Sequence, residues 1–144
     1  MSNIEGRTMR DFRELQSKLQ ETFLADDLVN TVYTSTADIN GKHTMYWAVV
    51  IEATGRTDYE EYSTYTYNWY FINKQNPQTA SKDIDWNYSM GMLIAKNAME
   101  RLEEEDISVQ YPVSYNFGSV KFADVCDVVT CTVTLQIENE LDCR

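Results

Sequence analysis

Few side chains in this sequence have the type and spacing of a catalytic site. His43 is the only histidine, so a zinc site with two imidazoles is hard to build and a serine triad would depend on this one residue. We interpret His43 as a surface residue beside a turn. Glu60 and Glu61 are adjacent, and adjacent side chains of a strand point to opposite faces, so they cannot act together on one glycosidic bond. The sequence therefore predicts no enzymatic activity.

The cysteines and glycines lack the motifs that bind metals or nucleotides. Cys126, Cys131 and Cys143 are odd in number and lack metal-ligand spacing, which favours reduced thiols in a cytosol. Asp124 and Asp127 flank Cys126 and could hold a metal ion, but a solvated turn explains them better. The five glycines are scattered, and none precedes the Lys-Ser or Lys-Thr pair of a phosphate-binding loop. We expect neither a metal nor a cofactor.

The charge balance is strongly acidic. Lys and Arg number 12 against 23 Asp and Glu, a net charge of -11, which disfavours tight nucleic-acid binding because that binding needs clustered cations. The acidic surface either keeps the protein soluble or repels DNA inside a channel, over a range of about 8 Å at physiological salt. The candidates for a lumen or partner surface are Asp58, Glu60, Glu61, Glu103, Glu104 and Glu105.

Hydrophobic periodicity and turn residues predict seven elements. In chain order these are a helix at 9–24, strands at 28–39, 43–53 and 59–72, a helix from 86 to 102, and strands at 107–115 and 129–137. Asn40-Gly41 predicts a hairpin turn between the first two strands, and residues 54–57 predict the next turn. Residues 73–85 are expected to form a loop. Pro112 marks its strand as an edge or bent strand.

These elements predict an α+β fold. We expect an antiparallel sheet of about five strands with two helices packed on one face, the order α-β-β-β-α-β-β, and a long β-hairpin arm. The 144 residues suit a single domain, with residues 1–8 and 139–144 as flexible ends. Ile4-Glu5-Gly6-Arg7 matches a protease-linker sequence, which we interpret as coincidence. There is no apolar stretch of membrane-spanning length and no signal-peptide core.

The predicted hairpin at 43–73 is unusually long and aromatic. Its second strand would span about 45 Å at about 3.3 Å per residue, so part of it should extend beyond the domain and need another chain or layer. The aromatic residues favour sheet core and subunit interface over a carbohydrate or small-molecule platform. The interface candidates are Trp47, Tyr59, Tyr62, Tyr65, Tyr67, Trp69 and Phe71.

The element order over residues 9–137 resembles the tail-terminator and head-tail connector ring proteins of tailed bacteriophages. The resemblance is one of architecture: a leading amphipathic helix, a long hairpin, a polar loop, a second helix and a closing alternating strand. It implies a structural subunit of the virion, assembled in the host cytoplasm into a ring of about six or twelve copies. Such a ring would contact portal, connector or tail proteins and surround passing DNA without binding it specifically.

Two other functions fit the sequence. One is a cone-shaped α+β protein that binds a small molecule between its curved sheet and the first helix, in a pocket lined by Trp47, Tyr65, Tyr67 and Trp69. The other is an acidic adaptor or inhibitor that mimics the charge of nucleic acid. Saturable thermal stabilisation by a ligand would favour the first, and salt-sensitive competition for a basic partner would favour the second.

Overall fold

Two helices and five strands form the fold, in the predicted class and the predicted order. The computed structural model describes residues 3–39, 44–75, 80–121 and 125–138, with the backbone alone at 3–11 and 80–83. The elements are α1 (Asn3–Leu24), β1 (Thr31–Tyr33), the 3-10 turn η1 (Thr36–Asp38), β2 (Ala48–Asp58), β3 (Tyr62–Lys74), α2 (Ala80–Glu104), β4 (Ser108–Lys121) and β5 (Val125–Glu138).

Strand β3 is the centre of the sheet, whose order is β1-β2-β3-β5-β4. It pairs with β5 over its whole length and with β2 over most of it. Trp69 on β3 stands opposite Ile51 on β2 and Cys131 on β5. All neighbouring strands are antiparallel except β1 and β2, which are parallel.

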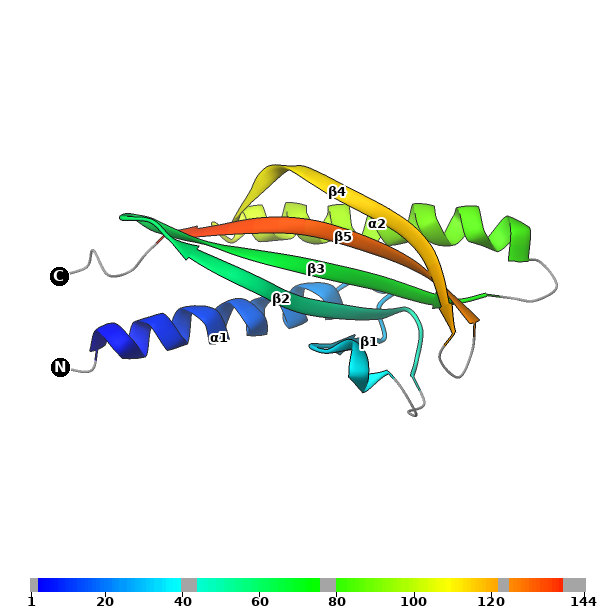
Figure 1. Ribbon diagram of the computed structural model, residues 1–144, viewed down its shortest axis with the longest axis horizontal. Helices are drawn as coiled ribbons and strands as arrows, with labels where there is room; N and C mark the ends of the chain where they lie inside the picture. Colours follow the sequence, from blue (N-terminus) through cyan, green and yellow to red (C-terminus); the bar gives the residue numbers. More distant parts are fainter. Residues whose placement is uncertain (1–2, 40–43, 76–79, 122–124, 139–144) are drawn as a thin grey trace.

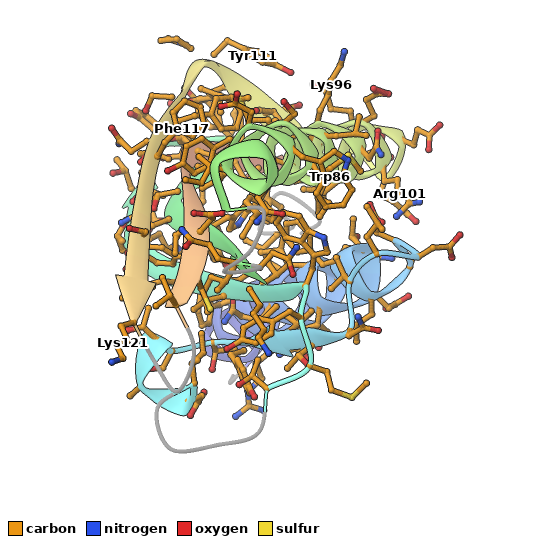
Figure 2. All side chains as sticks on the ribbon, turned by 90° about the vertical axis from the view of Figure 1, so that its right-hand side faces the viewer. Trp86, Lys96, Arg101, Tyr111, Phe117 and Lys121 are labelled. Carbon is orange, nitrogen blue, oxygen red and sulfur yellow. The ribbon has the colours of Figure 1, made fainter. Side chains whose placement is uncertain are left out.

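Both helices cover the same face of the sheet (Figures 1 and 2). Leu15, Leu19 and Phe23 recur every four residues along α1 and are at most 2% exposed, so one stripe of this helix is core. Ala95 and Leu102, two turns apart on α2, are fully buried and belong to the core-facing stripe of that helix. The main hydrophobic core therefore lies between this helix pair and the sheet.

The aromatic face of the hairpin is part of that core, which corrects most of the predicted interface. Phe23 packs edge-on against Trp69 with ring centroids 5.0 Å apart, Phe12 lies 5.7 Å from the Tyr65 ring, and Gln16 accepts a 2.7 Å hydrogen bond from the Tyr67 hydroxyl. The two helices cover most of the length of the hairpin on this face, so no second chain is needed to bury its aromatic rings. The predicted interface residues that are at most 4% exposed are Trp47, Tyr65, Tyr67, Trp69 and Phe71.

The first predicted strand is mostly irregular, and its hairpin is absent. Only Thr31–Tyr33 pairs with another strand, and that pairing with β2 is parallel, so the two strands need a crossover connection instead of a tight turn. Ser35 ends the extended segment because its hydroxyl accepts the Ala37 N–H at 3.2 Å and caps η1. The predicted turn residues Asn40-Gly41 lie outside the described residues.

Other predicted boundaries also differ. The strand predicted at 107–115 continues to Lys121 as β4, and the strand predicted at 129–137 begins at Val125 as β5. Residues 54–57 stay in β2, where a bulge leaves Thr54 without a partner in the ladder and Gly55 pairs with Thr66; the chain turns at 59–61 instead. Helix α2 begins at Ala80, inside the predicted loop, and α1 begins at Asn3, before the predicted start at residue 9. The ends of a helix are weakly marked in a sequence when the residues before them can also be helical.

Gly91 lets α2 approach β5 closely. A Cβ atom at this position would lie 2.8 Å from Cγ2 and 3.1 Å from Cβ of Val129. Real Cβ contacts are longer, so any side chain at 91 would push the helix away from the sheet.

We expect Phe23→Ala to lower the free energy of unfolding by about 3 to 5 kcal/mol, because it leaves a cavity between α1 and the rings of β3. Chemical denaturation followed by circular dichroism measures this. Leu24→Ala is the matched control, since Leu24 is 53% exposed and one position away. Equal losses in the two variants would contradict the described orientation of α1.

Candidate functional site

Away from the end that carries η1, the face of the sheet opposite the helices is polar and rich in hydroxyl groups. Along β5, Val133 is buried and Thr132 is exposed, so the alternation expected of this strand separates a core face from a hydroxyl face. The Thr132 hydroxyl donates to Asn68 Oδ1 at 3.0 Å, and the Thr54 hydroxyl donates to Thr66 Oγ1 at 2.9 Å. These bonds tie neighbouring strands together across this open face.

The sheet has two edges that stay unpaired in the described part of the chain. β1 pairs only with Ala48–Val50, so the outer edge of β2 from Glu52 to Asp58 has no described strand beside it. β4 forms the opposite edge and pairs with β5 alone. Unpaired N–H and C=O groups along an edge are a template for a further strand.

The β4 edge is uncharged over half of its length. The ladder with β5 is interrupted between Gln110 and Ser114, around Pro112, which confirms the prediction that this strand is an edge. Residues 114–120 carry no charged side chain. Phe117 in this stretch is 50% exposed. An uncharged exposed edge is unusual for a protein that avoids pairing with others.

Helix α2 holds Phe117 in place. Its ring stacks on Tyr88 with centroids 4.6 Å apart and an interplanar angle of 26°. The Tyr88 hydroxyl also donates to the carbonyl of Gly118 at 3.3 Å. Figure 2 shows Phe117 at the border between β4 and α2. The edge is therefore supported from the helix side and presents a fixed surface.

The two open edges have opposite polarity. β2 is antiparallel to β3, β3 to β5, and β5 to β4, so β4 runs opposite to β2. A second copy placed beside the first without turning over would present its β2 antiparallel to this β4. The helices of both copies would then lie on the same face of one continuous sheet.

Carboxylates gather at the end of the sheet where β2 turns into β3. Glu61, Glu103, Asp106 and Glu138 line one hollow of about 510 Å³. Two of the six predicted acidic candidates, Glu61 and Glu103, are therefore brought together from distant parts of the sequence. Among the described residues, no group of three or more His, Cys, Asp and Glu is arranged to hold a metal ion.

Asp58 lies at the same end of the sheet, but its carboxylate binds residues of β2 and β3. Arg56 Nε donates to Asp58 Oδ1 at 2.6 Å, and the Ser63 hydroxyl donates to the same oxygen at 2.7 Å. The Ser63 bond, followed by the Arg56 bond, holds the pKa of Asp58 below its ordinary value. Its charge is thus partly compensated.

The remaining acidic candidates stay at the surface near the end of α2. Glu105 forms an exposed ion pair with Lys18 at 3.5 Å, and such pairs add little stability. Glu104 lines a smaller hollow of about 330 Å³ that also contains Lys18. Glu60 is exposed in the hairpin turn.

Tyr59 and Tyr62 are the two predicted interface residues that remain at the surface. Their rings stack with centroids 4.6 Å apart and an angle of 22°. Tyr59 is 49% exposed, and Tyr62 is half-buried. They lie at the turn of the hairpin, next to the acidic hollow.

The small-molecule pocket predicted under the first helix is filled by that helix. Leu19 and Phe23 pack into the core with the rings of Trp69 and Tyr67, and each of these side chains is fully buried. Burial raises the pKa of the Tyr67 hydroxyl above its ordinary value. The predicted location is therefore wrong, because α1 supplies large apolar side chains at every turn that faces β3.

Asp127 is not in a solvated turn, as its sequence context suggested, but in the core. It is 1% exposed and accepts hydrogen bonds from Gln75 Nε2 at 2.7 Å and Asn87 Nδ2 at 2.9 Å. Asn73 Nδ2 in turn donates to Asn87 Oδ1 at 2.9 Å. Alternation along β5 points Asp127 toward α2, where these amides satisfy it. Sequence analysis missed this cluster because its members come from three elements.

The remaining candidates for a nucleophile or a metal ligand are either buried or outside the described residues. Cys126 and Cys131 are buried and not joined in a disulfide. His43, Asp124 and Cys143 lie outside the described residues.

The sequence matches no protein-family model, and no curated protein is significantly similar to it. Within the part of the chain that the structure describes, neither helix has the length and apolar character needed to cross a bilayer.

We expect the Cys131 thiol to react very slowly in the folded protein. Burial raises its pKa from 9.0 to about 12, against a smaller lowering by the Tyr115 hydrogen bond. At pH 8 its thiolate fraction should be roughly a thousandfold below that of an unfolded thiol. Iodoacetamide labelling followed by peptide mass spectrometry measures the rate, with the protein in urea as the control. Similar rates in the folded and unfolded protein would show that Cys131 is accessible.

Proposed function

We propose that the protein is a structural subunit that assembles head to tail with copies of itself into a closed ring. The ring would be of the kind found at the head-tail connector or tail end of tailed bacteriophages. The observation that supports this most is the pair of open sheet edges on β2 and β4, which have the opposite polarity needed for antiparallel pairing between identical copies.

Head-to-tail pairing uses two different surfaces of each copy. Such contacts form a ring when the rotation from one copy to the next adds up to a full turn, so that the last copy meets the first. Neighbouring strands in a sheet are rotated by roughly 20 to 25°. Extending the sheet from copy to copy therefore adds rotation at every step. The buried aromatic residues of the hairpin do not contribute to this contact.

The charge distribution suits contact at these edges. A second copy also carries a net charge of -11, so the least repulsive approach is along the uncharged residues 114–120 of β4. On the β2 edge, Asp58 is compensated by Arg56, and Glu52 accepts a hydrogen bond from the Tyr70 hydroxyl at 3.0 Å.

The acidic end fits a surface that faces DNA without binding it. Glu61, Glu103, Asp106 and Glu138 lie together there, and carboxylates repel phosphates over about 8 Å at physiological salt. Turned toward the ring axis, this end would line a channel for passing DNA. Turned toward a portal, connector or tail protein, it would meet a basic surface.

We expect the wild-type protein to form one closed species of several subunits at high micromolar concentration. Native mass spectrometry and negative-stain images check the mass and the ring shape. A monomer at that concentration rejects the proposal. A dimer alone also rejects it, because a twofold contact through a single edge ends at two copies.

We expect Phe117→Asp to dissociate the ring into monomers, because it places a like charge on the β4 edge. Tyr88→Ala is the matched control: it removes the same ring stack from the helix side and leaves the edge uncharged. Loss of the stack costs about 0.5 to 1.5 kcal/mol in either variant, which thermal melting detects. If both variants remain assembled, the β4 edge is not the contact.

A further inference from the structure

A cavity of about 550 Å³ lies on the open face of the sheet, at the end opposite the hairpin turn. Thr36 and Ala37 of η1 form one wall, and the last part of β4 forms the other. Figure 2 shows the end of β4, marked by Lys121, curling toward η1. The volume is within the range of about 300 to 1,000 Å³ that is typical of ligand pockets.

The floor of the cavity is rigid and apolar. Ile72 of β3 is 1% exposed and belongs to a second core cluster with Val50 and Cys126 on this face. Tyr70 and Val128 pack against the same cluster and also line the cavity. A floor made of core side chains keeps its shape without a ligand.

Among the described residues that line the cavity, none has a charged side chain. Its polar groups are hydroxyls and one amide, among them Thr130, Ser119 and Asn116. The Tyr70 hydroxyl donates a hydrogen bond to Glu52 Oε1 at 3.0 Å, and Glu52 is not one of the residues that line the cavity. Burial, and next the hydrogen bond to Glu52, raise the pKa of Tyr70, so the phenol stays neutral. An ionic ligand would find no countercharge among these groups.

Gly118 leaves space on the β4 side. A Cβ atom at this position would meet no other atom within 4 Å. The alternation of β4 places Asn116, Gly118 and Val120 on the open face, opposite Thr130, Val128 and Cys126 of β5. The edge of β4 points sideways, so side chains can line the cavity while the backbone pairs with another strand.

The shape of the floor favours a compact ligand. Along the strands it extends from Tyr70 to Ile72 and from Val128 to Thr130, which is about 7 Å at about 3.3 Å per residue. On β4 it extends from Asn116 to Val120, which is about 13 Å. Across the sheet it runs from β3 to β4, two strand spacings or about 10 Å. A fused ring system covers such a floor better than an extended acyl chain.

We propose that this cavity binds a neutral, compact aromatic molecule of the size of two fused rings, carrying one hydrogen-bonding group that faces Thr130 or Asn116. A second copy that pairs with the backbone edge of β4 would lie beside the sheet, whereas Asn116 and Gly118 of the cavity lie on its open face. The proposal is independent of ring assembly and extends beyond it.

The test uses the full-length protein and a neutral naphthalene dye with one carbonyl group, 6-propionyl-2-dimethylaminonaphthalene. We expect saturable binding in the micromolar range with a blue shift of its emission, and a higher melting temperature with the dye. An anionic anilinonaphthalene sulfonate and a neutral monoacylglycerol below its micellar concentration should bind at least tenfold more weakly.

Two variants fill the cavity from opposite walls: Gly118→Leu from β4 and Ala37→Phe from η1. Each should weaken dye binding at least tenfold. Ser114→Leu is the control, since Ser114 is on the same strand and face but outside the cavity, and it should bind as the wild type does. The two filling variants belong to different elements. If one of them misfolds, the other still tests whether the dye binds in this cavity.

Three outcomes overturn the proposal. They are no saturable binding of the neutral dye by the wild type, equal binding by both filling variants, and equal or tighter binding of the anionic dye. If the filling variants change the mass of the assembly in native mass spectrometry while dye binding persists, the cavity receives a second copy instead. A monomeric wild type that binds the dye would reject the ring and retain this site.

Discussion

The fold depends on the central position of β3, which is paired on both sides and buries aromatic side chains toward the helices. Tyr65, Tyr67, Trp69 and Phe71 alternate along it and are at most 2% exposed. Burying rings of this size supplies a large share of the hydrophobic stabilisation of a domain. It also requires a cover of matching length, which α1 and α2 provide. With both helices committed to one face, the other face and both edges remain available for contacts.

Much of the fold could be predicted because its signals are local. The alternation of Val129 to Ile137 and the spacing of Leu15, Leu19 and Phe23 report which side of each element is core, and the structure agrees. A strand was predicted at 28–39, but the parallel pairing of Thr31–Tyr33 could not be predicted, since it depends on a distant strand. The same holds for Gly55, where a bulge and a turn have the same local signal and only the long register with β3 decides between them.

The functional surfaces were less predictable because they combine residues from several elements. The aromatic stripe of the hairpin suggested an interface, but sequence alone cannot show that helices of the same chain are long enough to cover it. The acidic hollow joins Glu61 and Glu103, and the cavity joins η1, β3, β4 and β5. The uncharged stretch at 114–120 was visible in the sequence, yet it became informative only once β4 proved to be the end of the sheet.

The close approach of α2 to β5 at Gly91 has an evolutionary consequence. The helix axis is held at a distance that leaves no room for a methyl group beside Val129. Among descendants of this sequence, the two positions should change together: an alanine or serine at 91 should be accompanied by a smaller residue at 129. An alignment deep enough to detect such paired substitutions would reveal this helix-to-sheet distance without any coordinates.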